Sequence, residues 1–323
     1  MKAIVITKYG SPEVLQLQDM DKPVPKAGEV LIQVKAASVT AADTMMRKGK
    51  PLFGRLFIGL TRPKHPIAGT GFSGVVEAVG EEVTKFDIGD EVFGESVLGV
   101  GTNAEYLCLS EEGLLVHKPR HLSHEEVASI CDGPLTSWNF LKEMAMVKAG
   151  QRILINGASG SLGTAAVQLA KHLGAHVTGV CSTTNIDLVR SLGADEVIDY
   201  TLIDVTAGLQ KYDVIFDSVG KLSYVSSKKV LTQAGIYLSP VLSLSLLFQM
   251  IWSGLFTRKK AKFSATGLKP VSELRVLLDE LLALLEQRKL RSIIDRTFQL
   301  ADVSSAHAYV DTGHKKGNVV ISM

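Results

Sequence analysis

Arg152-Ile-Leu-Ile-Asn-Gly-Ala-Ser-Gly-Ser-Leu-Gly163 is the stretch that decides the fold, and Thr-Ala-Ala-Val-Gln-Leu-Ala-Lys171 follows it. Its first four residues are typical of a short buried strand, and glycine then recurs at every third position. Apolar residues continue at helical spacing, at Leu162, Ala166, Leu169, Ala170 and Leu173. A strand, a glycine turn and a helix N-terminus together make a diphosphate site, because the backbone can approach the phosphates and the helix offers unpaired N–H groups. We therefore predict that a nucleotide cofactor contacts Gly157, Ala158, Ser159, Gly160, Ser161, Leu162 and Gly163.

A glycine-rich stretch alone is weak support for a cofactor, and the spacing here is G-x-x-G-x-x-G rather than G-x-G-x-x-G. The residues around it are more informative. Further strands are expected at 175–181, 196–200, 212–216 and 235–238, and a further helix begins near Asp187. Strands that alternate with helices indicate a parallel, doubly wound sheet of the Rossmann type in an α/β protein.

The rest of the chain predicts a second domain. Residues 1–121 are rich in short strands that glycine and proline interrupt, as in an irregular β-barrel. Ser123 and Glu126 form a capping box, which starts a helix at the beginning of a cofactor domain over 122–264. Residues 265–323 have no place in the nucleotide sheet, and we expect them to return to the N-terminal domain.

Composition limits the partners. With 323 residues and a net charge of +2, the chain has room for two domains and no attraction for a polyanion, so a nucleic-acid partner is not expected. The three cysteines form no pair or framework, which suits a reducing compartment. The N-terminus lacks the long apolar region of a secretory signal, and we predict a cytoplasmic protein.

The segment 235–257 carries no charged residue, and Arg258, Lys259 and Lys260 follow it. It is long enough to span a bilayer, but its start is needed as a strand, Pro240 interrupts it, and serines dilute it. The remaining part, 241–256, is short for a span. We expect an apolar flap over the substrate site or a subunit contact, and peripheral contact with a membrane surface stays open.

Several segments taken together resemble the medium-chain dehydrogenase/reductase superfamily, in its zinc-less quinone oxidoreductase-like branch. The resemblance covers the whole chain and rests on residues 9–15, 25–31, 69–80, 89–94, 156–163, 192–200, 212–220 and 313–321. It implies a GroES-like, partly open barrel joined to a Rossmann domain, an active site in the cleft between them, and a homodimer.

The resemblance also bears on metal. Zinc-dependent relatives carry a cysteine and a His-Glu pair where this chain has 37–43 and 69–71, and they have a four-cysteine cluster that is missing here. We therefore expect no metal. Without zinc to polarise an alcohol, reduction of an electrophilic acceptor is favoured, because a quinone or an α,β-unsaturated carbonyl takes hydride directly.

Catalytic positions follow from the same resemblance. Thr40 and Asp43 match an Asn-x-x-Asp pair beside the nicotinamide, and Thr136 matches a threonine at its edge, although Thr136 could equally be a helix N-terminal hydroxyl. An aromatic residue that lines the quinone site in some relatives would fall near Pro51 and is absent. That absence, with threonine in place of asparagine, keeps an alternative open: a non-catalytic NADPH-binding regulatory protein, docked through 241–256.

The remaining cofactor contacts lie at the ends of strands. The second strand ends in Cys181, Ser182 and Thr183, without the acidic residue that usually binds the ribose of NAD, so NADPH is favoured. No cation follows in this loop, and Arg190 or a distant lysine would have to supply one. The other contacts implied by the resemblance are Tyr200 at the 2′-phosphate, Asp217, Val219 and Gly220 at the adenosine and ribose, Ser239 and Pro240 near the nicotinamide, and Asn318, which could instead cap a turn.

Overall fold

The computed structural model describes residues 1–96 and 101–323, apart from the side chains of Phe53 and Phe57. Packing divides the chain into two compact units. Unit 1 comprises Met1–Asp132, Pro270–Val276 and Ser292–Met323, and unit 2 comprises Gly133–Lys269 and Leu277–Arg291. The domain limits after 121 and 264 stay a prediction, because the units are defined by packing and place their own limits after Asp132 and Lys269.

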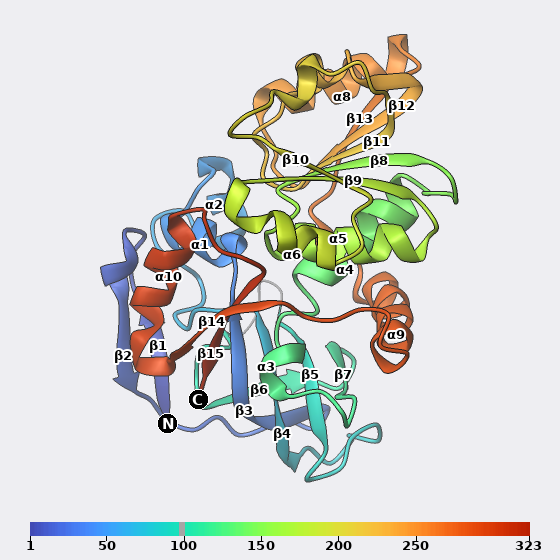
Figure 1. Ribbon diagram of the computed structural model, residues 1–323. Helices are drawn as coiled ribbons and strands as arrows, with labels where there is room; N and C mark the ends of the chain where they lie inside the picture. The colour runs from blue at the N-terminus through green and yellow to red at the C-terminus, as the bar shows by residue number, and fades with distance from the viewer. Residues whose placement is uncertain (97–100) are drawn as a thin grey trace. The chain divides into compact units, whose positions relative to one another are not determined.

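A seven-stranded sheet is the framework of unit 1 (Figure 1). Its order is β14-β15-β3-β4-β5-β7, with β6 also paired to β3, and β14 runs parallel to β15 while the other pairs are antiparallel. The strands are β3 (Glu29–Val39), β4 (Gly71–Val79), β5 (Glu91–Glu95), β6 (Tyr106–Ser110), β7 (Leu114–His117), β14 (Ile294–Gln299) and β15 (Asn318–Ser322). A separate antiparallel pair joins β1 (Lys2–Ile6) to β2 (Leu15–Asp19).

The long strand β3 organises this sheet. Its register with β4 shifts twice, between Leu31 and Ile32 and between Val34 and Ala36. Such bulges bend a strand and increase its twist, so β3 can pair with β4, β6 and β15 along its length. This gives unit 1 the irregular β character that its glycines and prolines predict.

Unit 1 also contains the helices α1 (Ala41–Lys48), α2 (Arg55–Ile58), α3 (His124–Val127) and α10 (Val303–Asp311). The predicted capping box of α3 is confirmed: the Ser123 amide donates to Glu126 Oε2 at 2.8 Å, and the Glu126 amide donates to Ser123 Oγ at 3.2 Å. Helix α10 buries Val303, Ala306 and Val310 in a cluster with residues of β1, β3 and β15.

Unit 2 contains a six-stranded parallel sheet in the order β10-β9-β8-β11-β12-β13, which confirms the doubly wound prediction. Its strands are β8 (Arg152–Asn156), β9 (His176–Cys181), β10 (Glu196–Asp199), β11 (Tyr212–Asp217), β12 (Leu231–Ser239) and β13 (Lys260–Phe263). Strand β12 begins four residues before the predicted strand. The edge strand β13 was not predicted, because its Lys-Ala-Lys-Phe sequence is short and half polar.

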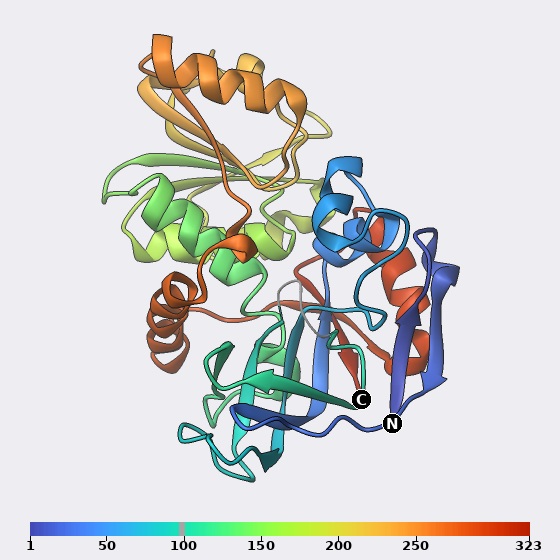
Figure 2. The ribbon, with the colours of Figure 1, turned by 180° about the vertical axis from the view of Figure 1, so that it is seen from behind.

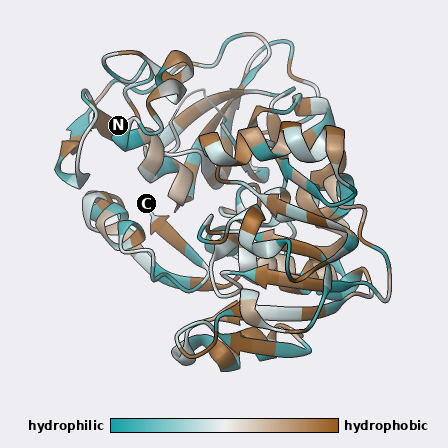
Figure 3. Cartoon of the chain, turned by 90° about the horizontal axis from the view of Figure 1, so that it is seen from above, coloured by the Kyte–Doolittle hydropathy of each residue, from teal (hydrophilic) through white to brown (hydrophobic). Residues whose placement is uncertain are grey.

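Helices α4 (Gly133–Trp138), α5 (Ser161–His172) and α6 (Ile186–Ser191) lie on one face of this sheet, and α8 (Leu244–Phe256) lies on the other (Figures 1 and 2). The short α7 (Tyr224–Ser227) precedes β12, and a π-helical turn over Asn139–Met144 continues α4. The middle residues of β8 and β11 are fully buried, and Figure 3 shows several strands in brown, the hydrophobic colour, over most of their length.

Helix α9 (Val271–Glu286) contributes its first residues to unit 1 and the rest to unit 2. Among the described residues, no helix is long and apolar enough to cross a membrane. The uncharged segment after Pro240 forms α8, which has 13 residues.

Candidate functional site

The glycine loop between β8 and α5 has the shape that a diphosphate needs. Gly157 has a φ of +75°, and a Cβ there would lie 2.8 Å from the side chains of Ser218 and Val219. A Cβ at Gly163 would lie 2.0 Å from the Gly157 carbonyl oxygen, so glycine is required for the helix to start this close to the loop. The sequence-predicted loop therefore folds as a tight turn against α5.

Gly160 differs from the other two glycines. A Cβ there would find only the Gly157 carbonyl oxygen, at 3.5 Å, so this side of the loop is open. Gly160 is the N-cap of α5, and the first N–H groups of a helix have no partner within it. The open side and the helix N-terminus together fit the diphosphate of a dinucleotide.

Helix α4 supports the start of α5. The Ser137 hydroxyl donates to the Leu162 carbonyl at 2.8 Å, and α4 packs against α5. Thr136 is half-buried in the first turn of α4, directly before Ser137. This position agrees with both interpretations of Thr136, and its contact with a nicotinamide stays a prediction.

Asn185 joins the glycine loop to the end of β9, and sequence reasoning missed this role. Its side-chain amide donates to Ser159 Oγ at 3.0 Å and to Ser182 Oγ at 3.2 Å, and the residue is buried. In the sequence Asn185 stood out only as a position without a cation. No local sequence pattern predicts the contact between Asn185 and Ser159, which are 26 positions apart.

A carboxylate lies beside the end of β9, although β9 itself ends without one. Asp199, at the end of β10, pairs in register with Cys181. It accepts hydrogen bonds from Thr183 Oγ1 at 2.5 Å, Thr201 Oγ1 at 2.7 Å and the Thr201 amide at 2.9 Å. The two hydroxyls lower the pKa of Asp199. Tyr200 follows it, with an exposed side chain and its amide bonded to the Cys181 carbonyl at 3.1 Å.

Asp217 shapes the turn after β11. The carboxylate is fully buried and accepts hydrogen bonds from Asn156 Nδ2 at 2.8 Å, the Gly220 amide at 3.0 Å, the Leu222 amide at 2.8 Å and the Tyr237 hydroxyl at 2.9 Å. Gly220 has a φ of +68°, and Val219 is exposed between them. Asp217 therefore holds the loop that presents Val219, and cofactor contact by any of the three stays a prediction.

Ser239 ends β12, and its buried hydroxyl accepts the Val241 amide at 3.2 Å across Pro240. The parallel sheet brings the ends of β8, β9, β11 and β12 to one edge. Ligands of doubly wound proteins bind at this edge. The predicted cofactor residues of unit 2 are therefore gathered at one place, as the alternation of strands and helices implied.

In unit 1, Thr40 and Asp43 form a capping box at the start of α1. The Thr40 amide and hydroxyl donate to Asp43 Oδ2 at 2.8 and 2.7 Å, and the Asp43 amide donates to Thr40 Oγ1 at 3.1 Å. The Thr70 hydroxyl is the third donor to this carboxylate, and it lies 3.3 Å from Asp43 Oδ1. The predicted pair is thus in contact, and Thr70 is a partner that sequence reasoning did not name.

Burial raises the pKa of Asp43 to about 6, against the hydrogen bonds from Thr40 and Thr70 that lower it. The charge of Asp132 raises the pKa of Asp43 further. A proton on Asp43 is therefore exchangeable near neutral pH.

Two other groups of unit 1 have pKa values that burial changes. Burial raises the pKa of Glu95, and the charges of Asp132 and Asp43 add to the effect. Burial lowers the pKa of Lys315 to about 8, although the charges of Asp132 and Asp295 oppose this.

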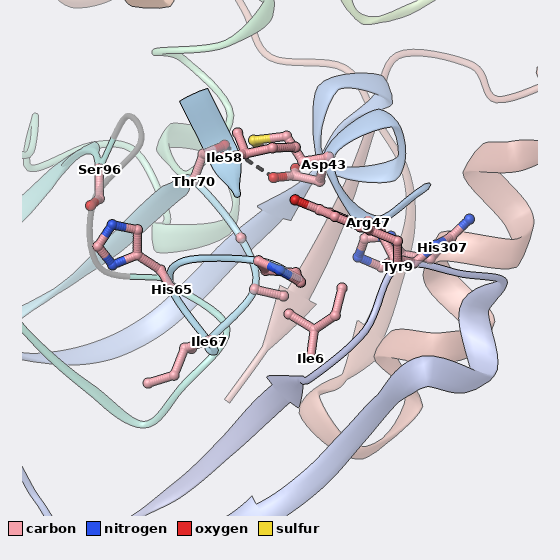
Figure 4. Close-up of a pocket in the computed structure, with 14 residues that line it drawn as sticks. Ile6, Tyr9, Asp43, Arg47, Ile58, His65, Ile67, Thr70, Ser96 and His307 are labelled. Carbon is pink, nitrogen blue, oxygen red and sulfur yellow. Dashed lines mark hydrogen bonds between the residues drawn. The ribbon is translucent and has the colours of Figure 1, made fainter. Parts of the chain in front are cut away.

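Asp43 and Thr70 line a pocket with a cavity volume of about 90 Å³. Figure 4 shows them beside each other, with His65 and Ser96 on one side of the pocket and Tyr9, Arg47 and His307 on the other. The remaining lining residues are mostly apolar: Ile6, Met46, Ile58, Pro63, Ile67, Ala68 and Gly69.

Tyr9 gives this pocket an aromatic wall. Its hydroxyl donates to the Gly59 carbonyl at 2.5 Å, and the Arg55 guanidinium lies 4.4 Å from its ring centroid. Near Pro51, where the resemblance places an aromatic residue, the sequence has none. The sequence did not show that a residue 42 positions earlier would line the pocket.

Asn318 opens β15 in unit 1. Its amide donates to the Ile293 carbonyl at 2.7 Å, and its side chain donates to the same carbonyl at 3.1 Å and to Ser292 Oγ at 3.3 Å. These contacts fit the turn-capping alternative, and a cofactor contact by Asn318 stays a prediction.

Within residues 1–96 and 101–323, no three His, Cys, Asp or Glu side chains are grouped so that they could hold a metal ion.

The three thiols are free and poorly ionised. Burial raises the pKa of Cys108 and of Cys181 to about 11, and it raises that of Cys131 well above its ordinary value. Nearby carboxylates, chiefly Glu29, Asp199 and Glu95, add to the effect.

Comparison with known proteins agrees with this arrangement. Residues 26–120 match the alcohol dehydrogenase GroES-like domain family, which confirms the predicted type of the N-terminal domain, and residues 192–321 match a family described as zinc-binding dehydrogenase. The chain is 34% identical to the Mus musculus protein named NAD(P)H oxidoreductase RTN4IP1, mitochondrial, over 100% of this chain and 89% of that protein.

Two further relatives are named for different electron acceptors. The Arabidopsis thaliana protein named NADPH-dependent alkenal/one oxidoreductase, chloroplastic, is 31% identical over 99% of this chain and 79% of its own length. The structure of the quinone oxidoreductase from Coxiella burnetii is 30% identical, with a TM-score of 0.87 over 100% of this chain and 99% of that one.

Proposed function

Since the chain belongs to the medium-chain dehydrogenase/reductase superfamily and is an NAD(P)H-dependent oxidoreductase, we propose that it uses NADPH to reduce a quinone or an α,β-unsaturated carbonyl without zinc. The names of relatives support both acceptor classes. The observation that carries the proposal is the apolar pocket of unit 1, in which a buried carboxyl with a pKa of about 6 contacts a hydroxyl.

A nicotinamide cofactor, when bound, would supply a hydride ion, and an acceptor that takes it up would need one further proton to become a hydroquinone or an enol. Asp43 can hold that proton, and the Thr70 hydroxyl, which contacts Asp43 and lines the pocket, can pass it on. When Asp43 is ionised, the Thr70 hydroxyl donates to it. When Asp43 is protonated, it can donate to Thr70 Oγ1, and the Thr70 hydrogen turns to an acceptor oxygen in the pocket.

The residues at the zinc-ligand positions of related dehydrogenases support the metal-free part of the proposal. Thr70 lies within 69–71, where the zinc-dependent relatives carry the His-Glu pair, and it bonds to Asp43. A hydroxyl and a carboxyl exchange a proton with an acceptor oxygen, whereas a zinc site would need about three nitrogen, sulfur or oxygen ligands from the protein.

The preference for NADPH over NADH rests on the end of β9. Ser182 and Thr183 are small hydroxyl residues, and the side chain of Tyr200 is exposed beside them. The Asp199 carboxylate accepts from Thr183 and Thr201. We therefore propose that Asp199 orders these hydroxyls and limits the preference. The variant Asp199→Asn removes a negative charge and is expected to raise the ratio of kcat/KM for NADPH to that for NADH.

The deciding experiment is a panel of quinones, enones and enals with NADPH and NADH, followed by the absorbance of the reduced nicotinamide. Turnover with at least one acceptor class and no added metal is expected. If the protein binds NADPH and turns over neither class, it is a binding protein rather than a reductase. Zinc bound in stoichiometric amount would contradict the metal-free part.

Substitutions at the pocket test the proton path. Thr70→Ala is expected to lower kcat about 100-fold, the lower end for loss of a proton-transfer group, while Thr70→Ser keeps most of the activity. In the wild type, kcat is expected to rise as the pH falls through about 6. Asp43→Asn should abolish that dependence, and the exposed Asp21→Asn is the matched control. Equal kcat in the Thr70 alanine and serine variants would refute the path.

A stability measurement separates the pKa of Asp43 from its role in turnover. The folded-state pKa, about 6, is above the ordinary value of 3.8, so this stabilising contribution is present below about pH 4 and is lost as the pH rises through 6. Relative to Asp43→Asn, the wild type should lose about 3 kcal/mol of unfolding free energy between these limits. A pH-independent difference would show that Asp43 is not protonated in this range.

The homodimer that the resemblance implies is part of the proposal, and light scattering at several concentrations tests it. The cytoplasmic location stays a prediction, because two of the relatives are named as a mitochondrial and a chloroplastic protein.

A further inference from the structure

Helix α8 turns its apolar stripe to solvent. The exposed side chains recur at helical spacing along one face, which we call the α8 outer face: Leu244, Leu247, Phe248, Ile251, Trp252, Leu255 and Phe256. Leu244 is 84% exposed and Leu255 is 72% exposed. The opposite side carries the buried Leu246 and Ser253, which face the sheet of unit 2. Figure 2 shows α8 in orange along that sheet.

The aromatic residues of the α8 outer face lie in one row. The ring centroids of Phe248 and Trp252 are 6.3 Å apart, and those of Trp252 and Phe256 are 4.7 Å apart. No residue of α8 carries a charge. A contiguous exposed apolar patch of this kind marks an interaction surface rather than ordinary surface variation.

Basic residues flank this face at its C-terminal end. Residues 218–272 contain eight basic residues and no Asp or Glu: Lys221, Lys228, Lys229, Arg258, Lys259, Lys260, Lys262 and Lys269. Lys211 and Lys228 act on Lys259, whose pKa is lowered by burial and then by their charges. Lys259 Nζ donates to the Lys228 carbonyl at 2.6 Å, so these segments are in contact. We call Lys211, Lys228, Arg258 and Lys259 the basic rim.

The charges decide between the occupants that an apolar face could have. A second copy would bring its own α8, whose surrounding segment has no acidic residue to complement the basic rim. An anionic bilayer supplies both partners, because its headgroups are negative and its acyl chains are apolar. The helix is about 20 Å long and cannot cross the bilayer, but it can lie in the interface with Trp252 near the headgroups.

We propose that unit 2 docks on an anionic lipid surface through α8, with the α8 outer face among the acyl chains and the basic rim on the lipid headgroups. This inference goes beyond the proposed reductase function and does not depend on it.

The test is co-sedimentation of the full chain with phosphatidylcholine vesicles that contain or lack phosphatidylserine. Binding to the anionic vesicles is expected to exceed binding to the neutral ones by at least about tenfold at low salt, because each basic residue near the surface adds attraction. Salt should weaken it. The emission of Trp252 should shift to the blue on binding, while the buried Trp138 contributes a constant background.

Variants separate the two parts of the surface. The triple variant Phe248→Ser, Trp252→Ser, Phe256→Ser should lose binding to both kinds of vesicle. Arg258→Glu should weaken binding to the anionic vesicles and leave binding to the neutral ones unchanged. The matched control is Leu202→Ser, which is 78% exposed and follows β10 at the opposite edge of the sheet. An unchanged melting temperature shows that each variant is folded.

The proposal would be overturned if the wild type did not bind anionic vesicles, or if the triple variant bound them equally well. If the wild type bound no vesicles and was dimeric while the triple variant was monomeric, the α8 outer face would instead be assigned to a second copy of the chain.

Discussion

Helices α5 and α8 lie on opposite faces of the same sheet and use apolar residues in opposite ways. In α5, Gly163, Ala165, Ala166, Val167, Leu169 and Ala170 are buried. In α8 only Leu246 and Ser253 are buried, and the larger apolar side chains face solvent. Small residues let α5 approach β8 and the glycine loop closely, whereas most of the large apolar side chains of α8 are exposed. Apolar content therefore predicts a packed element only when the size of the side chains also fits.

The largest contrast is expected at the glycines of the two helices. Gly163→Val in α5 would place atoms against the Gly157 carbonyl, where even a Cβ is only 2.0 Å away. The backbone must move, so we expect a loss of at least about 3 kcal/mol of unfolding free energy and of NADPH binding. Thermal unfolding and a fluorescence titration with NADPH measure both. Retention of NADPH affinity would show that the loop is not packed as tightly as described.

The second contrast lies within α8. Leu246→Ala removes a side chain that packs with β8, β11 and β12, and it should cost about 2–4 kcal/mol. Leu255→Ala, on the α8 outer face, should change stability by no more than about 0.5 kcal/mol. Denaturant unfolding of the two variants compares them directly. Equal costs would mean that the outer face is covered in solution.

A smaller effect is expected at Ser253, which ties α8 to the edge strand β13. Its buried hydroxyl accepts the Ala261 amide at 3.0 Å. Ser253→Ala leaves this amide without that partner and should cost about 1–2 kcal/mol. Hydrogen exchange at the Ala261 amide reports the same loss locally. Exchange as slow as in the wild type would show that another group replaces the hydroxyl.

The smallest effect, and the only stabilising one, is expected at Gly254. A Cβ there meets nothing within 4 Å, in contrast to Gly163. Gly254→Ala should stabilise the chain by up to about 1 kcal/mol, because alanine favours the helix. A lower melting temperature for this variant would indicate that the α8 backbone approaches a neighbour at this point.

The sequence predicted those features that follow from local pattern. The glycine loop, the alternation around it and the capping box at Ser123 all depend on residues within a few positions of one another, and the structure contains each of them. The edge strand β13 escaped prediction, because four half-polar residues carry too little pattern. The prediction for 241–256 recognised an unusual apolar segment but not which residues would face outward.

The candidate site was only partly predictable, because its partners meet through the fold. Asp199 reaches the end of β9 from the neighbouring strand, and Tyr9 and Thr70 join Asp43 from distant segments. The pairing of Thr40 with Asp43 followed from the family resemblance. The pKa of Asp43 did not, since burial sets it and burial depends on the whole of unit 1.

The three thiols have a consequence for the chemistry proposed above. Quinones and enones are electrophiles that add to thiolates, and a reductase that concentrates them exposes itself to alkylation. Only the thiolate reacts readily, and the pKa values of Cys108, Cys131 and Cys181 are all raised, those of Cys108 and Cys181 to about 11. At neutral pH these cysteines are thus almost entirely protonated, so alkylation of the thiols by such acceptors should be slow.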